Sequence, residues 1–353
     1  MLGLDPRAAR VAWTVFFVAL LITVVYLIRR TLLIFTAALL FAYLLSPLVD
    51  MVDRFTPRRF SRTLSLGVVY LLLLAILGTA GALIGSRILD EASALAGRLP
   101  QYVQNRELLT QFPVPSWLEP YREQLIAAMR KQVQENAGEI VPFLQRLGGH
   151  LVSLIGNLGF VILVPILSFF FLKDASAFRS TLLDQIDGAR RAFIDSIMAD
   201  LHILLALFMR ALVILSLATF MFYATFLQIV GVPYAVLLSG VAAVLEFIPV
   251  VGPLVGSASI LLVAAFTGYP HLLWILIFLA VYRLFQDYVL QPYLMSSGVE
   301  LPPIIVIFGV LAGEQIAGIP GMFLSIPVLA TLRVIYVRIQ KRRQTSELQL
   351  DRA

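Results

Sequence analysis

The chain has 353 residues, of which 60% are hydrophobic and 14% are charged, with a mean hydropathy of +0.91 and a net charge of +6. Ordinary soluble domains carry about 25% charged residues, so this composition excludes a water-soluble fold. The Lys and Arg residues lie in short clusters beside apolar runs and form no basic stripe, which argues against nucleic-acid binding, and the lack of cysteine excludes disulfides and thiolate metal sites.

Apolar segments follow one another along the chain, and each is long enough to enter or cross a hydrocarbon layer about 30 Å thick. Because unpaired backbone groups are not tolerated in lipid, and short alternating strands are not seen, all of them are predicted to be helices. The predicted fold class is all-α, a polytopic helical membrane protein with about eight membrane segments. They lie at about 11–28, 31–49, 64–86, 151–172, 211–230, 235–266, 272–291 and 303–337.

Five regions are predicted from these segments and from the polar stretches between them. A helical pattern that begins at Ser116 indicates an amphipathic extramembrane segment, and a second pattern between 175 and 209 indicates interfacial helices. The regions are the N-terminal membrane helices (1–86), the amphipathic extramembrane segment (87–150), a membrane helix with interfacial helices (151–210), a transport core (211–337) and a basic cytoplasmic tail (338–353).

The basic residues give a topology in which both termini are cytoplasmic. Clusters within 54–62, 173–191 and 338–343 then all fall on the cytoplasmic side, whereas Arg29 and Arg30 lie in a tight turn on the other side. The side on which 87–150 lies stays open, because long loops respond weakly to charge.

Two of the apolar segments, 235–266 and 303–337, are too long for one straight span and carry internal Gly and Pro residues. Each piece is about 14 to 17 residues, which suits half of a re-entrant hairpin. With the spans before them, the two segments form a degenerate repeat, a pattern that points to a transporter binding site.

If the broken segments cross the membrane, the two units are parallel; if they are hairpins, which we favour, the units are inverted. The residues predicted to form the breaks or hinges are Pro249, Gly252, Pro253, Pro292, Gly318, Pro320 and Gly321.

Glu246 is the one charged residue between Arg210 and Arg283, inside the phrase Leu245 to Pro253. A carboxylate at the centre of a membrane helix costs about 2.5 to 3.5 kcal/mol, so it is predicted to face a wet cavity, pair with a cation or stay protonated. It is a candidate solute- or ion-binding and proton-coupling residue. The alternative is a helix-end carboxylate that is satisfied by backbone amides near Pro249.

A second set of polar residues is predicted to share the site or to stabilise a span end. Arg283 and Asp287 are four residues apart and therefore lie on one helical face, which Gln291 continues. This face is either a structural ion pair or a polar stripe that meets the substrate. Small residues four apart, at Gly252 and Gly256 and again at Gly309 and Gly313, indicate helix packing. The candidate binding residues are Glu246, Arg283, Gln286, Asp287, Gln291, Glu314 and Gln315, the last two with a surface or cap role as the alternative.

The sequence offers little support for catalysis. The three histidines are scattered, and no phosphate-binding loop or serine nucleophile motif is present, so we expect no enzyme activity, no metal and no cofactor.

Several motifs make the chain resemble the AI-2E family of bacterial membrane transporters, also described as autoinducer-2 exporter-like proteins. They cover the second half well, while the first 150 residues match in hydropathy alone. The motifs are Phe169 to Asp174, Gly231-Val-Pro-Tyr234, Glu246-Phe-Ile-Pro-Val-Val-Gly-Pro253, Asp287, Gln291-Pro292, Met295-Ser296, Val299-x-Leu301 with Pro303, and Gly318-x-x-Gly321 with Pro327.

The resemblance implies a multi-pass protein of the bacterial inner membrane that exports small solutes, forms a homo-oligomer, with a pentamer as the candidate form, and contacts the lipid bilayer. Autoinducer-2 is the cargo it suggests, which would link the protein to quorum sensing.

The leading hypothesis is a secondary transporter or facilitator in which the two broken segments meet near the middle of the bilayer. One rival is a sodium/proton antiporter in which Glu246 alternates between a proton and a monovalent cation. Another is a non-transporting membrane scaffold that docks a partner through 87–150.

Overall fold

The computed structural model describes residues 6–55, 62–104, 120, 124, 158–294 and 301–350, and within these ranges the regular structure is helical, without strands. The all-α prediction is confirmed. The elements are α1 (Pro6–Leu27), α2 (Arg29–Phe55), α3 (Arg62–Ala80), η1 (Gly81–Gly85), α4 (Ser86–Gln104), α7 (Leu158–Asp184), α8 (Gly188–Ile229), α9 (Ala235–Leu245), α10 (Val251–Phe266), α11 (Leu272–Phe285), η3 (Gln286–Leu290), α12 (Gln291–Leu294) and α13 (Pro303–Leu350).

Among the described residues, six helical stretches are long and apolar enough to cross a membrane, while α9 and α10 are apolar but shorter. At 1.5 Å per residue, the 11 residues of α9 extend for about 16 Å and the 16 of α10 for about 24 Å, so neither crosses a 30 Å layer alone. The predicted break in 235–266 is therefore present. It falls at 246–250, just before Gly252 and Pro253, which lie in the first turn of α10 where proline is tolerated.

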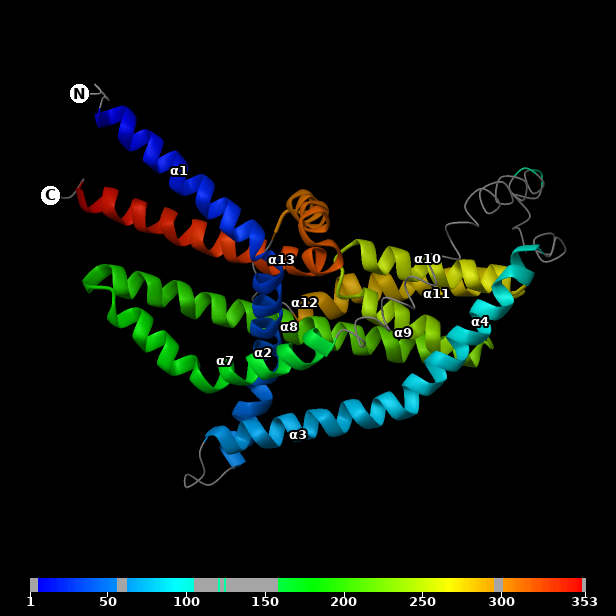
Figure 1. The fold of residues 1–353 in the computed structure, drawn as a ribbon. Coiled ribbons are helices and arrows are strands. Elements are labelled where there is room, and N and C mark those ends of the chain that lie inside the picture. The colour runs from blue at the N-terminus through cyan, green and yellow to red at the C-terminus, as the bar shows by residue number, and fades with distance from the viewer. Residues whose placement is uncertain are drawn as a thin grey trace.

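Two helices are longer than the sequence indicated. The segment predicted to end at 86 continues through the π-turn η1 into α4, and the interfacial pattern at 188–209 belongs to the same helix as the span at 211–230. The 42 residues of α8 extend for about 63 Å, roughly twice the hydrocarbon thickness. Figure 1 shows the start of α1, the α7–α8 turn and the end of α13 at one end of the molecule, and α4 at the other.

The predicted amphipathic segment 87–150 can be compared with the structure only in part. Residues 87–104 lie in α4, whereas the helix predicted from Ser116 onward falls almost entirely outside the described residues.

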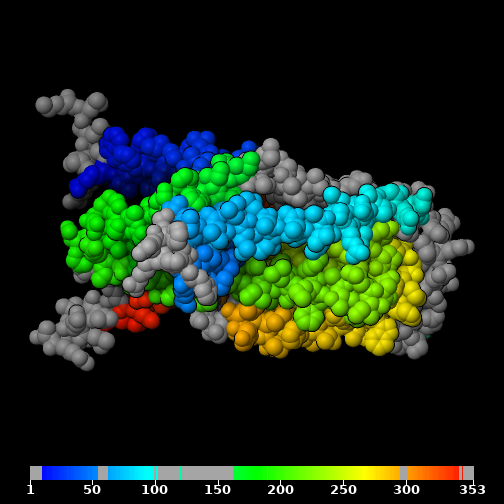
Figure 2. Space-filling view, turned by 90° about the horizontal axis from the view of Figure 1, so that it is seen from below, coloured from blue at the N-terminus to red at the C-terminus, as the bar shows by residue number. Residues whose placement is uncertain are grey.

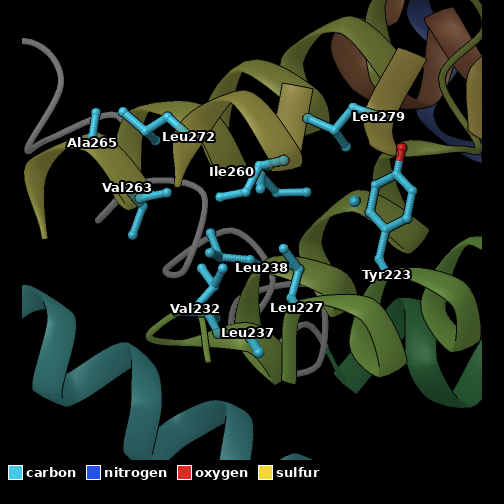
Figure 3. Close-up of a cluster of buried hydrophobic side chains, with 14 of the residues drawn as sticks. Tyr223, Leu227, Val232, Leu237, Leu238, Ile260, Val263, Ala265, Leu272 and Leu279 are labelled. Atoms are coloured by element: carbon cyan, nitrogen blue, oxygen red, sulfur yellow. The ribbon is translucent and has the colours of Figure 1, made fainter. Parts of the chain in front are cut away.

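The main core lies between α8, α9, α10 and α11. Its buried side chains include Leu227, Ile260 and Ile275, each essentially without exposed surface, and Figure 3 shows members of this cluster pointing toward one another from these helices. A second cluster joins α2, α8 and α13, and a third joins α2, α3 and α7. Large apolar side chains elsewhere remain exposed, most of all along α1, as expected for helices that face lipid.

Candidate functional site

Helices α9 and α10 form an antiparallel helical hairpin, which we call the first hairpin, with its tip at 246–250. Glycine makes the close packing possible: a Cβ atom on Gly252 would overlap the carbonyl oxygen of Leu245, and one on Gly256 would lie 3.2 Å from the Cα of Ala242. The small residues predicted to serve packing at 252 and 256 do so.

The long helix α13 folds back on itself at Gly318, whose φ of 62° and ψ of −142° are not helical. Its two limbs, 303–317 and 319–350, form the second hairpin. A Cβ on Gly313 would overlap Gly321, the reverse is also true, and a Cβ on Gly309 would lie 3.6 Å from the Cβ of Ser325. Position 313 faces 321 and position 309 faces 325, so the residue numbers fall in one limb as they rise in the other. The limbs are therefore antiparallel. The backbone thus has the geometry of the favoured hairpin interpretation.

The tip of the first hairpin contacts the second hairpin. Phe247, in the tip of the first hairpin, lies 5.9 Å from Phe323 of the second, measured between ring centroids. Both rings pack against the cluster that contains Leu212 and Leu324. The tip at 246–250 therefore contacts the second limb of α13, five residues past the break at Gly318.

Glu246 ends α9 and lies at this meeting point with 7% of its surface exposed. Gln286 Nε2 donates a hydrogen bond to Glu246 Oε1, and Thr219 Oγ1 lies 3.4 Å from Glu246 Oε2. The Thr219 hydroxyl is also 3.0 Å from the Tyr282 hydroxyl. Thr219, Tyr282 and Gln286 are 1%, 4% and 1% exposed, so the carboxylate belongs to a buried polar network formed by three helical segments.

The structure argues against one of the two interpretations of Glu246. The amides of Phe247, Ile248 and Val251 in the tip donate to backbone carbonyls of Val244, Leu245 and Pro249. The carboxylate is bonded by side chains of α8 and of the α11 segment instead, so it is not a helix-end group that local backbone amides satisfy.

The tip itself is strained. Val250 has a φ of 64° and a ψ of −55°, and the Val251 amide donates to the Pro249 carbonyl at 2.6 Å. This is a γ-turn with positive φ, a conformation that is rare and especially unfavourable for a β-branched residue. Strained backbone of this kind costs about 1 to 3 kcal/mol and clusters at functional sites.

Arg283 and Asp287 form an ion pair, one of the two arrangements that their spacing allowed. Arg283 Nε donates to Asp287 Oδ2 at 2.9 Å, and Nη2 lies 2.9 Å from Oδ1, with about two fifths of each side chain exposed. Arg283 is close enough to act electrostatically on Glu246, and its Nη1 is buried with no hydrogen-bond partner in the described part of the chain. Buried donors are normally paired, so this atom is an unusual feature of the site.

A π-turn interrupts the helix that carries the predicted polar face. The Gln291 amide donates to the Gln286 carbonyl, five residues back, within η3 and its end. Gln291 therefore follows Asp287 across a π-turn and not across a regular α-helical turn. The same bulge contains Gln286, and π-bulges are frequent at functional sites.

The other predicted site residues lie apart from this network. Glu314 and Gln315 are exposed on the first limb of the second hairpin, near its tip, and Gln291 is half-buried. Pro292 lies in α12, and Pro320 follows the break at Gly318. Sequence reasoning missed Thr219, because one threonine in an apolar span carries no signal of its own and its role comes from long-range packing.

Paired broken helices that meet beside a buried carboxylate are the architecture of polytopic membrane transporters, which place their sites where half-helices end. The family model for AI-2E family transporters matches residues 15–341. The chain therefore belongs to the AI-2E transporter family, and it is a multi-pass membrane transporter.

Relatives with transport names cover most of the chain. It is 27% identical to "Putative transport protein YueF" of Bacillus subtilis (strain 168), over 96% of both chains. It is 23% identical to "Putative transport protein MJ1177" of Methanocaldococcus jannaschii, over 91% of this chain and 93% of the relative. A third, "Putative transport protein YrrI" of Bacillus subtilis, is 24% identical over 51% of each chain.

Proposed function

We propose that this transporter exports a small polar solute across the bacterial inner membrane, along a route that passes the contact between the first tip and the second hairpin. The observation that carries the proposal is the buried network of Glu246, which joins Thr219 and Gln286 beside the contact of Phe247 with Phe323. A carboxylate in an apolar membrane segment is costly, and residues of this kind mark substrate and ion pathways in membrane proteins.

The chemistry of the network favours a solute that carries hydroxyl and carbonyl groups. Glu246 supplies acceptor oxygens, the Tyr282 hydroxyl can donate or accept, and Arg283 Nη1 is a donor without a partner in the described part of the chain. The aromatic ring of Tyr282 also lies beside Tyr223, with centroids 5.0 Å apart, which gives the polar groups an apolar wall. Autoinducer-2, the cargo that the family name suggests, is such a hydroxyl-rich solute and is the cargo we propose.

Alternating access would come from the hairpins. Their limbs are tightly joined through glycine contacts, so each hairpin moves as one unit, and rocking of either tip opens or closes the contact between Phe247 and Phe323. In this proposal the hairpins enter from opposite faces, both termini are cytoplasmic, and the subunits assemble as a homo-oligomer for which a pentamer is the candidate form.

Charge balance favours a second candidate, a sodium/proton antiporter. The two carboxylates of Glu246 and Asp287 face one guanidinium, that of Arg283, which leaves one formal negative charge in the site. A monovalent cation or a proton would neutralise this charge when it binds next to Glu246. The same residue then alternates between the two ions.

Reconstituted vesicles separate the two candidates. We would measure export of autoinducer-2 and, in parallel, sodium-dependent pH changes reported by an internal dye, for the wild type, Glu246→Gln and Asp90→Asn. Asp90 is the control, because it is an exposed carboxylate of α4 outside the proposed site. We expect Glu246→Gln to lower solute export at least tenfold while Asp90→Asn keeps most of it. Unchanged export in Glu246→Gln refutes the proposed site, and a sodium-driven pH change without solute export establishes the antiporter instead.

A further inference from the structure

The N-terminus of α9 has no cap from its own segment. The residue before it, Tyr234, has left-handed backbone angles (φ 60°, ψ 33°) and makes no side-chain capping hydrogen bond. Instead, Glu91 of α4 accepts a hydrogen bond from the Leu237 amide at 2.8 Å, across 146 positions of sequence. A carboxylate at a helix N-terminus satisfies a free amide and interacts favourably with the helix dipole.

The same face of α4 adds apolar contacts around Glu91. Ile88 and Ala92 pack against the main core, and Leu95 belongs to it with 6% of its surface exposed. With Glu91, they follow the spacing of one helical stripe. A Cβ on Gly240 of α9 would lie 3.1 Å from Ile88 Cδ1, so the missing side chain makes room for Ile88. Figure 2 shows α4, in cyan, lying along the yellow-green surface of the first hairpin's region.

The link between α3 and α4 is weak by comparison. It is the π-turn η1, Gly81–Gly85, in which no residue is buried. A Cβ added to Gly78, Gly81 or Gly85 would meet nothing within 4 Å, so packing does not require glycine at these positions. Glycines in an unpacked helix lower its stiffness, and a local π-turn is a known place for a helix to bend.

We propose that α4 is a strap that pivots at η1 and that Glu91 is the catch that fastens it to α9. When Glu91 accepts the hydrogen bond from Leu237, α4 restrains the N-terminal end of α9. When this bond is broken, α9 is free to move, and Glu246 at its C-terminal end moves with it. Glu91 is thus a positioning residue that acts through α9. The consequence for transport rests on the proposed function, whereas the opening of the strap does not.

Cysteine labelling tests the opening directly, because the native chain has no cysteine. We would place a single thiol at the buried position 95 (Leu95→Cys) in the reconstituted full-length protein and measure its rate of reaction with a soluble maleimide. The rate is compared with that after adding Glu91→Ala or, as the matched control, Asp90→Ala, which removes an exposed carboxylate from the neighbouring position. We expect at least a fivefold faster reaction with Glu91→Ala and no change with Asp90→Ala. Equal rates in all three proteins overturn the strap.

A cross-link tests whether opening matters for transport. In the double variant Ile88→Cys with Gly240→Cys, oxidation ties the strap to α9; a Cβ at 240 would lie 3.9 Å from Ile88 Cγ1, within reach of a disulfide after small adjustments. We expect export to fall at least fivefold on oxidation and to recover on reduction, while the single variants stay unaffected. Full export in the cross-linked protein overturns the gating role. If the wild type itself fails to export, the proposed cargo is wrong, and the labelling rates still decide the strap.

Discussion

Substituting alanine at the tip of the second hairpin tests the folded-back arrangement of α13. A Cβ on Gly313 would lie 2.7 Å from the carbonyl carbon of Gly321 and 3.1 Å from the Met322 amide nitrogen, besides overlapping the Gly321 carbonyl oxygen. Ordinary contacts of this kind begin near 3.4 Å, and the atoms in the way are backbone. The limbs must therefore separate, because no side chain can rotate aside.

Overpacking of a well-packed interface costs about 1 to 3 kcal/mol. With a shift of roughly 2 °C for each kcal/mol in a chain of this size, Gly313→Ala and Gly321→Ala should each lower the melting temperature by about 2 to 6 °C. The double variant should cost less than the sum, because one separation of the limbs makes room for both methyl groups.

The measurement is thermal unfolding of the detergent-solubilised protein, followed by tryptophan fluorescence. Gly67→Ala in α3 is the control, because a Cβ there meets nothing within 4 Å, and alanine in a helix is about 1 kcal/mol better than glycine. If the variants at 313 and 321 melt at or above the wild-type temperature, as Gly67→Ala should, then the limbs of α13 do not pack in this way.

Three further predictions address the site and the topology. Thr219→Val should remove the partner of the buried Tyr282 hydroxyl and one of the two hydrogen bonds to Glu246, at a cost of about 1 to 3 kcal/mol, and lower export, while Thr219→Ser retains both bonds; equal unfolding temperatures for the two would contradict the network. A thiol at Tyr269→Cys should react with an impermeant maleimide from outside and one at Gln344→Cys only from inside; reaction of both from one face would remove the inverted topology. Val250→Gly should relieve strain and raise the melting temperature, whereas Val251→Gly, at the start of α10, should lower it; the opposite order would rule out the positive φ at 250.

Much of the transport core could be predicted because its signals are local. Proline and glycine within 246–253 end α9 wherever the chain is placed, and the same reasoning located the break at Gly318. The hypothesis that the two broken segments meet rests on their corresponding positions in the repeat, and the contact of Phe247 with Phe323 shows that the first tip reaches the second hairpin. Four-residue spacing placed Arg283 and Asp287 on one face, and the structure shows them paired; whether this face also meets the substrate stays a prediction.

The parts that were not predicted depend on distant packing or on subtle backbone changes. The amphipathic pattern at 175–209 predicts interfacial helices separate from the span at 211–230, yet 189–229 contains no glycine or proline to end a helix, and α8 runs through. The π-turn at Gln286 has no sequence signature, so the register of Gln291 could not be foreseen. Thr219 becomes part of the site only because α8 packs against α9, which the sequence of either helix does not show.

Both hairpin tips contain a residue with positive φ, but the residue type differs between the two tips. This difference bears on which tip moves. At Gly318, a φ of 62° costs little because glycine has no Cβ, so the second tip is near its preferred geometry. At Val250, a φ of 64° opposes a β-branched side chain, so the first tip is held in place by its surroundings. Within the tip, the amides of Ile248 and Gly252 donate to backbone carbonyls, and Phe247 packs on Phe323. In the proposed function, a ligand or ion that binds Glu246, four residues earlier, would shift this turn and so couple occupancy of the site to the conformation of the first hairpin.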